Sequence, residues 1–580
     1  MANRKDGTNL MLLPADLSVA PASRQKLVAR EKNLKIIPLG GCEEVGRNMT
    51  VFEYDRDIVI VDMGLQFPEE DMPGIDYIIP NIKYLAGKEK NIRGIVFTHG
   101  HLDHVGAAPI LLEKLGYPPI IGRPLTIALI KGRQEDYKKG TAAKLRIIPV
   151  NDLNNIIQLG KFTLKFFQVE HSIMDAMGII LETRGGTIIH AGDWSLERNE
   201  RRRPIIDYSH LRKLAKPTIL MLESLGSTRQ ESVSSADVYR NLYNIISQAP
   251  GRVIIGTFSS QIERISWIIK TAEELGKKII LAGYSLKKNI EIAKELGYVR
   301  FKKNTLIDLG QIKDYPDGRI IIICTGAQGE RNAVLPRIVN REHRHIRLKK
   351  SDTIIFSSSI IPGHERTIQR LKDNIYRQSD HVIHSELMDV HISGHANRRD
   401  IADMIKMIKP TYFVPVYGNH YLLKEAAKLA VQIGFPKERI FVPDNGSIIL
   451  INKRSAKLLS RKVPSAYVFV DGLGITDMQN IVLRDRQVLA EDGMVVVIVT
   501  VDAKTGKLVH SPDIISRGFI FLKENKALIE DLRRRVRKMV EMGGHPDANE
   551  IKNHIRERAG QFLFSKTEKR PMILPVVIEV

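Results

Sequence analysis

Hydrophobic residues near the start of the chain occur in short runs, and most runs end at a glycine, a proline or a polar side chain. Such runs, when rich in β-branched and aromatic residues, predict buried strands. The apolar stretch at residues 105–115 predicts the start of a helix. The expected strands cover residues 34–38, 48–54, 57–61, 93–97, 144–149, 162–169 and 187–190.

After residue 205 the pattern changes to strands that alternate with longer helical segments. An alternation of this kind predicts a mainly parallel sheet with helices packed against it. We therefore place a second domain at residues 205–360. Its expected strands are 218–222, 252–257, 278–282, 319–324 and 353–356, and its expected helices are 236–247, 262–275 and 287–296.

Units of strand, loop and helix return in residues 361–452. The basic, polar stretch 453–464 predicts a linker to a last segment, 465–580. Residues 1–33 mix charges with a short apolar patch, which predicts a basic, flexible arm. The remaining expected elements are helices at 398–408, 421–433 and 525–542 and strands at 412–416, 466–470, 494–501 and 572–580.

Charge is the unusual feature of the composition. The 580 residues include 88 Lys and Arg against 66 Asp and Glu, a net charge of +22. This surplus favours a polyanionic partner such as nucleic acid, although a generally basic proteome or association with ribosomes would also produce it. Two cysteines exclude a disulfide framework. No apolar run has the length of a membrane span, so we expect a cytoplasmic protein without membrane contact.

Four candidate metal ligands follow directly on the strand expected at residues 93–97. Imidazole nitrogens combined with carboxylate oxygens are typical of a zinc site, and manganese is the alternative. Three further candidates stand at the ends of other expected strands, and this repeated placement favours a shared site over isolated structural histidines. The ligands are His99, His101, Asp103 and His104 in the loop, with Asp62, His171 and Asp193 at the other strand ends.

These residues resemble the ligand set of the metallo-β-lactamase fold. The insertion at 205–360, followed by Ser393-Gly394-His395-Ala396, resembles the β-CASP branch of that fold, which acts on nucleic acids. Within this branch the chain is most similar to the ribonuclease J family. That similarity also rests on residues 256–260, 325–330 and 357–363, and on 471–474, 481–486 and 570–575 near the C-terminus.

The resemblance implies an α/β fold: a metallo-β-lactamase αββα sandwich (34–204 and 361–452) with an inserted β-CASP α/β domain (205–360) and a small α/β C-terminal domain. It implies a zinc-dependent ribonuclease of RNA maturation and decay that degrades single-stranded RNA from a 5′-monophosphate end and also cleaves internally. Two Zn²⁺ ions per chain would be held by His99, His101 and His171 on one side and by Asp103 and His104 on the other. Asp193 would bridge them, Asp62 would orient a ligand histidine, and Glu223 and His395 would be catalytic.

One position departs from the family. Where the family usually has another histidine ligand, this chain has Tyr417, whose phenol resists ionisation and is a poor zinc ligand. His420 is the alternative extra ligand, and the second metal is expected to be weaker or exchangeable with Mn²⁺. Gln261 is a smaller departure from a usual Asn. The alternative function is therefore a weakly active or non-catalytic paralogue that acts as a partner subunit.

Several turns are candidate sites for RNA phosphates, because they place hydroxyls and backbone N–H groups before helices, although ordinary helix capping would use the same residues. These residues are Ser259, Ser260, Ser357, Ser358, His391, Ile392, Ser393, Gly394 and His395. Basic clusters at 198–203, 341–350 and 533–538 are expected to follow the RNA backbone. The resemblance further suggests a calcium site at Gly74, Asp76 and Asp471, a homo-oligomer (dimer or tetramer) or a hetero-oligomer with a paralogue, and association with an RNA-decay complex or the ribosome.

Overall fold

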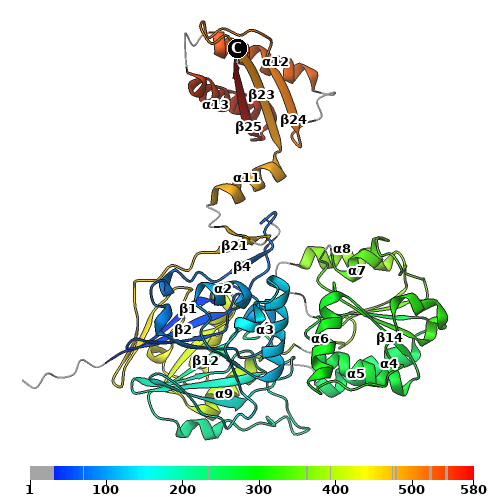
Figure 1. Cartoon of the computed structure of the whole chain (residues 1–580). Coiled ribbons are helices and arrows are strands. Elements are labelled where there is room, and N and C mark those ends of the chain that lie inside the picture. Colours follow the sequence, from blue (N-terminus) through cyan, green and yellow to red (C-terminus); the bar gives the residue numbers. More distant parts are fainter. Residues whose placement is uncertain are drawn as a thin grey trace, which may run out of the picture.

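The computed structural model of the chain comprises two large units that lie side by side and a third that stands apart from them (Figure 1). It describes residues 32–69, 71–230, 234–330, 332–358, 360, 364–391, 393–472, 474–476, 480–520, 525–541 and 547–580. The flexible arm expected at residues 1–33 therefore lies outside the described residues up to residue 31.

The first unit is built on two sheets. The larger has the strand order β20-β19-β1-β2-β3-β5-β6-β7, and the smaller has the order β18-β12-β11-β10-β9-β8. The strands of the larger sheet are β1 Leu34–Gly40, β2 Met49–Tyr54, β3 Asp57–Val61, β5 Ile92–Val96, β6 Ile120–Gly122, β7 Ile147–Pro149, β19 Ile449–Ile451 and β20 Ala456–Leu458. Those of the smaller sheet are β8 Ile157–Leu159, β9 Phe162–Gln168, β10 Met177–Thr183, β11 Gly186–His190, β12 Thr218–Glu223 and β18 Tyr412–Val416.

These two sheets pack face to face, and helices cover both outer faces. Phe52 and Val59 of the larger sheet lie in one core with Phe162 and Ile219 of the smaller sheet. The helices α1 Leu102–Val105, α2 Ala108–Lys114 and α3 Pro124–Tyr137 belong to the larger sheet's side, and α9 Arg398–Ile408 and α10 His420–Gln432 cover the smaller sheet. This is the predicted αββα sandwich.

The second unit is a five-stranded parallel sheet of order β14-β15-β13-β16-β17 with helices on both faces. Each of its strands is a nearly continuous apolar run, which parallel strands buried on both faces require. Its elements are β13 Val253–Gly256, β14 Lys278–Ala282, β15 Ile320–Cys324, β16 Thr353–Phe356, β17 His381–Ile383, α4 Ser235–Gln248, α5 Ile262–Glu274, α6 Tyr284–Glu295, α7 Val334–Val339 and α8 Glu365–Tyr376.

Three expectations about the strands are corrected. The strand expected at 218–222 in the second domain is β12, which pairs with β11 and β18 of the sandwich. The insert's sheet continues past residue 360 to β17. The stretch 453–464, expected to be a linker, contains β20, which pairs with β19 at the edge of the larger sheet. In each case a tertiary partner, rather than the local sequence, decides where the strand belongs.

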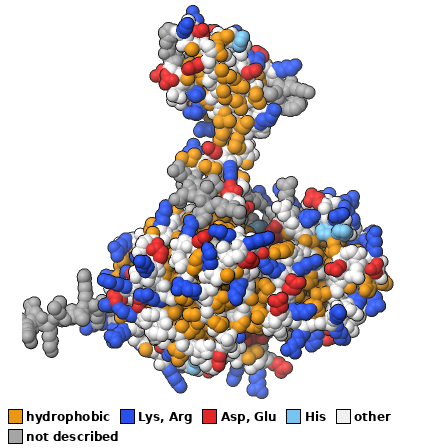
Figure 2. Space-filling model, viewed as in Figure 1, with side chains coloured by type: hydrophobic (Ala, Val, Ile, Leu, Met, Phe, Trp, Pro, Cys, Tyr) orange, Lys and Arg blue, Asp and Glu red, His pale blue; other side chains and the backbone are white. Residues whose placement is uncertain are grey.

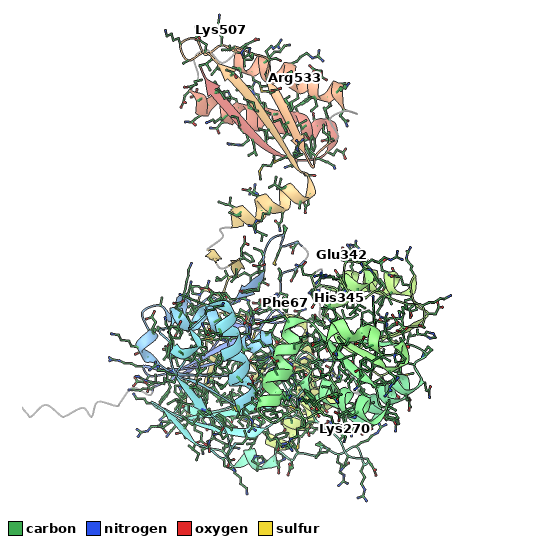
Figure 3. The ribbon with its side chains drawn as sticks, turned by 45° about the vertical axis from the view of Figure 1, so that its right-hand side comes forward. Phe67, Lys270, Glu342, His345, Lys507 and Arg533 are labelled. Atoms are coloured by element: carbon green, nitrogen blue, oxygen red, sulfur yellow. The ribbon has the colours of Figure 1, made fainter. Side chains whose placement is uncertain are left out.

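The third unit follows a small sheet made from two stretches that are far apart in the sequence. In that sheet β21 Val468–Asp471 pairs with β4 Tyr77–Ile79 and with β22 Gly474–Thr476. Helix α11 Asn480–Glu491 then leads to a sheet of β24 Asp513–Arg517, β23 Met494–Val501 and β25 Met572–Glu579, covered on one face by α12 Lys526–Glu541 and α13 Ala548–Thr567. Figure 3 shows Lys507 and Arg533 on this unit, well separated from Phe67 and Lys270.

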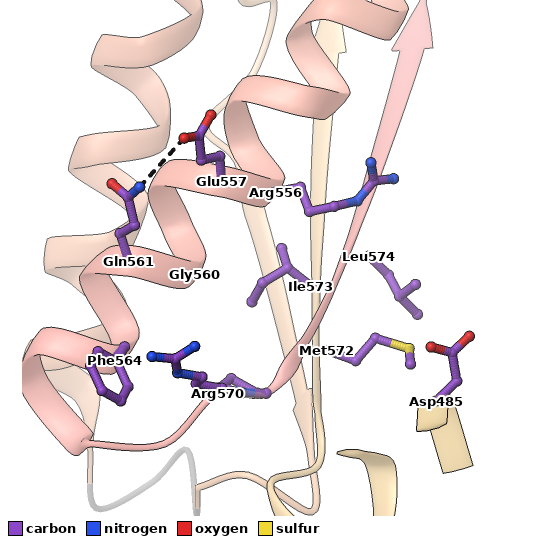
Figure 4. A pocket seen from close by; sticks show the side chains of 11 residues that line it. Asp485, Arg556, Glu557, Gly560, Gln561, Phe564, Arg570, Met572, Ile573 and Leu574 are labelled. Atoms are coloured by element: carbon purple, nitrogen blue, oxygen red, sulfur yellow. Dashed lines mark hydrogen bonds between the residues drawn. The ribbon is translucent and has the colours of Figure 1, made fainter. Parts of the chain in front are cut away.

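A cavity of about 540 Å³ lies in the third unit between α13 and β25 (Figure 4). Gly560 leaves room there, and the Arg570 guanidinium lies 4.4 Å from the centre of the Phe564 ring. Within the described part of the chain, no helix has the length and apolar character needed to cross a bilayer.

Candidate metal centre and phosphate site

The ligand loop and the ends of four neighbouring strands meet at one edge of the sandwich. β9, β11, β12 and β18 of the smaller sheet all run in the same direction, so their carboxyl ends lie together. His171, Asp193, Glu223 and Tyr417 stand at or just after those ends. The loop after β5 brings the remaining candidate ligands to this edge from the larger sheet.

Three histidines converge on one point. His101 Nδ1 lies 3.1 Å from His99 Nε2 and 3.0 Å from His171 Nε2. Burial lowers the pKa of all three, to about 4 for His101 and about 3 for His171, so the imidazoles are neutral at physiological pH. Neutral imidazole nitrogens that face one another are the donor set that a zinc-type ion requires.

A second group of ligands adjoins the first through Asp193. The Asp193 carboxylate lies 3.2 Å from His104 Nε2, 3.9 Å from His99 Nε2 and 4.0 Å from His171 Nε2. Asp103 is 3.5 Å from the same His104 nitrogen. Both Asp193 oxygens are buried and lack a well-oriented hydrogen bond among the described residues. A buried carboxylate in this state, between two sets of imidazoles, fits a bridging metal ligand.

Other contacts hold the ligand rings in place. Asp62, which is buried, accepts hydrogen bonds from the Thr98 backbone N–H and hydroxyl and lies 2.7 Å from His104 Nδ1. The Gly394 carbonyl lies 2.6 Å from His171 Nδ1. Each contact places the proton on Nδ1 and leaves Nε2 directed into the centre. Asp62 therefore has the orienting position expected of it.

Glu223 and His395 form a pair at the same centre. His395 Nδ1 lies 2.7 Å from Glu223 Oε2 and 3.7 Å from Asp193 Oδ2, while the other Glu223 oxygen accepts the Trp194 backbone N–H at 2.8 Å. Burial disfavours the imidazolium, but the two carboxylates outweigh it and raise the pKa of His395 to about 9. His395 is therefore a cation at neutral pH. A Cβ added to Gly394 would lie 2.6 Å from the Ser172 side chain, so only glycine lets the backbone before His395 lie this close to Ser172.

Tyr417 fills the position of the missing histidine, and it pairs with His190, a buried residue that the sequence analysis did not identify. The Tyr417 hydroxyl lies 3.2 Å from His190 Nε2, and Tyr417 packs edge-on against the His104 ring. Burial raises the pKa of Tyr417 well above its usual value, and the nearby Asp62 and Asp193 raise it further. His190 ends a predicted strand, and nothing in its local sequence distinguished it from an ordinary core residue.

The expectation that His420 could replace the missing ligand is wrong. His420 is about half exposed and lies 3.0 Å from Asp444, in a group with Glu43 that is separate from the groups around His99 and Asp193. It is the first residue of α10 and is exposed.

A buried arginine gathers several of the candidate phosphate residues. Arg264 of α5 donates to the Ser357 carbonyl at 3.0 Å, to the Ser357 hydroxyl at 3.2 Å and to His391 Nδ1 at 2.7 Å. Its Nε atom is buried with no hydrogen-bond partner among the described residues. Burial lowers the pKa of Arg264 to about 10, which keeps it cationic, and no carboxylate in the described chain forms an ion pair with it. A buried cation of this kind is suited to an anionic ligand.

The other candidate phosphate residues lie around this arginine or between it and the metal centre. Ser358 follows Ser357 at the end of β16, and Ser259 and Ser260 form the turn that opens α5. Ser393 accepts a hydrogen bond from the His395 backbone N–H. Ile392 lies outside the described residues. The sequence did carry a signal for Arg264, a charged residue one turn before Ile268 in an apolar helical stripe.

The three residues of the candidate calcium site, Gly74, Asp76 and Asp471, lie close together, but the guanidinium of Arg486 lies between them. Arg486 donates to the Gly74 carbonyl at 2.9 Å and to the Asp471 carboxylate at 2.6 Å. Asp76 accepts the Gly472 backbone N–H at 2.8 Å. The arginine supplies the positive charge that a calcium ion would supply, so this arrangement does not favour calcium.

Comparison with known proteins gives a consistent match along the chain. Four family models match: Metallo-beta-lactamase superfamily (43–244), Ribonuclease J, beta-CASP domain (250–375), Zn-dependent metallo-hydrolase RNA specificity domain (380–443) and Ribonuclease J C-terminal domain (481–580). Ribonuclease J2 of Bacillus subtilis is 34% identical over 559 residues, which cover 95% of this chain and 99% of the relative. Ribonuclease J 1 of Streptococcus pyogenes is 36% identical over 550 residues, covering 94% and 97%.

The fold is also similar to the crystal structure of a protein of unknown function from Enterococcus faecalis. The TM-score is 0.50 at 15% sequence identity, over 72% of this chain and 100% of that one. At this identity the similarity concerns the fold alone.

Proposed function

This chain belongs to the ribonuclease J family, and from that premise we propose that it is a metal-dependent ribonuclease. It degrades single-stranded RNA in the 5′-to-3′ direction, prefers a 5′-monophosphate end and also cleaves internally. The observation that carries this proposal is the convergence of His99, His101, His171 and Asp193 with the Glu223–His395 pair at one sheet edge. Two Zn²⁺ ions, with Mn²⁺ as the alternative at the second site, are the proposed cofactors.

The residues that would hold the metals are the two adjoining sets. His99, His101 and His171 would bind one ion, Asp103 and His104 the other, and Asp193 both. When bound, such ions supply Lewis acidity and an activated water for attack on a phosphodiester. Burial keeps the imidazoles of His99 and His171 neutral, and the pKa of Asp193 lies well below its usual value because His104 is close to it. These donors are therefore in the protonation states that bind a metal ion.

The chain's own proton chemistry resides in the Glu223–His395 pair. His395, held protonated by Glu223, can donate a hydrogen bond to a non-bridging phosphoryl oxygen and stabilise the charge that develops there. It can also transfer its proton to the leaving 3′-oxygen. Glu223 is itself fixed by the Trp194 backbone N–H, so the imidazolium keeps one orientation during the reaction.

Arg264 supports a preference for a 5′-monophosphate. Its guanidinium, with the Ser357 hydroxyl, forms a buried cationic group next to the segment that carries His391 and His395. A terminal phosphate bound there would place a nearby phosphodiester at the metal centre. A terminal triphosphate is larger than a monophosphate, and a terminal hydroxyl carries no charge, so both would pair less well with the buried guanidinium.

The test uses the purified full chain and three labelled RNAs that differ only in their 5′ ends. With Zn²⁺ or Mn²⁺ present, we expect 5′-mononucleotides from the monophosphorylated RNA and far fewer from the triphosphorylated or hydroxyl RNA. A circular RNA reports internal cleavage. An Asp193→Asn preparation controls for contaminating nucleases. Absence of any cleavage with either metal would overturn the proposal.

One observation favours a second function. Tyr417 and His190 occupy the place of a metal ligand, which supports a weakly active or non-catalytic paralogue that serves as a partner subunit. The same assay distinguishes the two functions, because the partner-subunit hypothesis expects slow or no cleavage by this chain alone.

We also propose that the chain is a homo-oligomer, a dimer or tetramer, or pairs with a paralogue. The open face of the third unit's sheet supports this, since Leu574, Val576 and Ile578 are 40–45% exposed there, and Figure 2 shows a band of hydrophobic side chains on this unit. Light scattering of the wild type and of a Val576→Glu variant tests it. We propose a cytoplasmic location, which the buried, unpaired Cys42 and Cys324 support.

A further inference from the structure

A basic pocket lies outside the metal centre, on the surface where α9 meets the turn at residues 198–204. It has a volume of about 410 Å³. Pro204 and Met407 form the apolar part of the pocket lining. Asp403 is the one carboxylate among the residues that line the pocket. The cationic residues that line it are Arg198, Arg202, Arg203, Arg212, Arg399 and Lys406.

The carboxylates near the pocket are already engaged. Arg198 binds Asp400 at 2.5 Å and Asp403 at 2.9 Å, so one arginine takes up both. Arg212 donates to the Lys406 carbonyl and to the Met407 carbonyl at the end of α9, and neither of these acceptors carries a charge. Arg203, Arg212, Arg399 and Lys406 form no ion pair among the residues that the structure describes, so these four lining cations exceed the carboxylates available to them there.

Backbone contacts hold several of these cations in place. Arg399 donates to the Arg202 carbonyl at 3.2 Å, and the Asn199 carboxamide accepts the Arg203 backbone N–H at 3.1 Å. Arg203 has no ion pair among the described residues, and its side chain is exposed. Keeping several guanidinium groups of like charge together costs electrostatic free energy, which a bound polyanion would offset.

The pocket is close to the metal centre along the chain. Arg198 is the fifth residue after Asp193, and Arg399 is the fourth residue after His395. Even a fully extended chain spans no more than about 18 Å over five residues. At about 3.4 Å per nucleotide, the rise along one strand of B-form DNA, this reach corresponds to at most about five stacked nucleotides.

We propose that this pocket binds backbone phosphates of the RNA substrate on the 3′ side of the scissile bond. The inference rests on the proposed function, because a 5′ end held at Arg264 leaves the rest of the strand to run away from the metal centre. RNA is the ligand that the observations favour, since guanidinium groups pair with phosphates in a planar, two-bond geometry and the pocket lies within reach of the site.

The test compares two double variants with the same change in net charge. Arg203→Glu with Lys406→Glu alters two exposed cations of the pocket, and Arg201→Glu with Lys213→Glu alters two exposed cations that do not line it. RNA of 20 nucleotides and a 5′-phosphorylated dinucleotide serve as substrates. The dinucleotide has one nucleoside and no further phosphate beyond its scissile bond, so it offers the pocket no backbone phosphate.

For the pocket variant we expect at least a tenfold weaker affinity for the 20-nucleotide RNA, measured by fluorescence anisotropy in an Asp193→Asn background. The slope of log Kd against log salt should fall by about 1.4, because each phosphate that the protein no longer neutralises on a single strand lowers it by about 0.7. The KM for the dinucleotide should stay within twofold of the wild type. The control variant should bind the long RNA as the wild type does.

Equal weakening in both variants would mean a general charge effect and would overturn the proposal, as would unchanged affinity in the pocket variant. If the pocket variant lost binding to vesicles of phosphatidylglycerol or to an acidic peptide while keeping its RNA affinity, the ligand would be of another class and the proposal would be wrong. Failure of the wild type to hydrolyse even the dinucleotide concerns the metal centre and would overturn the proposed function instead. Unchanged melting temperatures confirm that the variants are folded.

Discussion

The Tyr417 hydroxyl lies 3.2 Å from His190 Nε2 in a fully buried position beside the metal centre. The Gly192 backbone N–H donates to His190 Nδ1 at 3.0 Å, so Nδ1 is the acceptor nitrogen of a neutral ring. Burial lowers the pKa of His190 to about 3, which keeps it neutral. Its proton is therefore on Nε2 and is donated to the tyrosine oxygen. Tyr417 is nevertheless a neutral phenol, a weak ligand for zinc, because burial and the nearby Asp62 and Asp193 carboxylates raise its pKa.

The first prediction concerns metal content. The wild type, after dialysis against metal-free buffer, should retain close to one zinc per chain, because only the set of His99, His101 and His171 has three nitrogen ligands. Tyr417→His should raise the content toward two, since a second imidazole would join His104 and Asp193. Inductively coupled plasma mass spectrometry measures both values.

Two control variants accompany this measurement. Tyr417→Phe removes the hydroxyl without adding a ligand and should leave the content unchanged, while His420→Ala should do the same because His420 pairs with Asp444 away from the centre. Two tightly held ions in the wild type would show that Tyr417 does not weaken the second site.

The second prediction concerns the charge of His395 in the metal-free protein. Its pKa of about 9 depends on the Glu223 and Asp193 carboxylates, which outweigh burial. A raised pKa means that His395 stays protonated below about pH 9 and loses its proton above it. In Glu223→Gln the burial remains while one carboxylate is lost, so the pKa should fall by at least one unit. Nuclear magnetic resonance of histidine-labelled protein follows the titration, and an unchanged pKa in this variant would contradict the pairing.

Much of the fold follows from local sequence. β13, β15 and β16 are short runs rich in β-branched residues, and in the structure they are buried parallel strands that begin and end close to the predicted residues. α13 was not predicted, because its polar residues and Gly560 obscure the spacing of its apolar face. β12 was predicted as a strand but placed in the insert, since nothing within Thr218–Glu223 indicates that its neighbours are β11 and β18.

The site was partly predictable for a related reason. His99 to His104 form a compact motif, so their role could be inferred from spacing, and the structure brings His171 and Asp193 to them. His190 could not be found in this way, because its partner Tyr417 is distant in sequence and the two meet only through the packing of β11 and β18. Arg264 could have been identified as a charge within an apolar helix face.

The third prediction concerns the selection of 5′ ends. Arg264→Gln removes a buried cation, and a hydrogen bond to a charged group contributes about 1.5–3 kcal/mol, or roughly 10- to 100-fold in rate. The ratio of kcat/KM for 5′-monophosphate RNA to that for 5′-hydroxyl RNA should fall by this factor. Cleavage of circular RNA should change little, since it has no terminal phosphate. Arg264→Lys, which keeps the charge, should retain part of the preference. An unchanged ratio would exclude Arg264 from recognition of the 5′ end.

The fourth prediction concerns the stability of the insert. Arg252 and Asp352 form a buried two-bond ion pair, with Nε to Oδ1 at 2.9 Å and Nη2 to Oδ2 at 2.6 Å, and Asp352 also accepts the Lys349 backbone N–H. Asp352→Asn would leave the buried guanidinium without its counter-charge, which costs about 3–5 kcal/mol.

The matched control is Asp317→Asn, which breaks an exposed ion pair with Lys349 worth at most about 1 kcal/mol. Hydrogen exchange of peptides from β15 and β16 should show much faster opening in the first variant and little change in the second. Equal exchange in the two variants would mean that the buried pair does not hold β13 and β16 together, and that the apolar core alone stabilises this sheet.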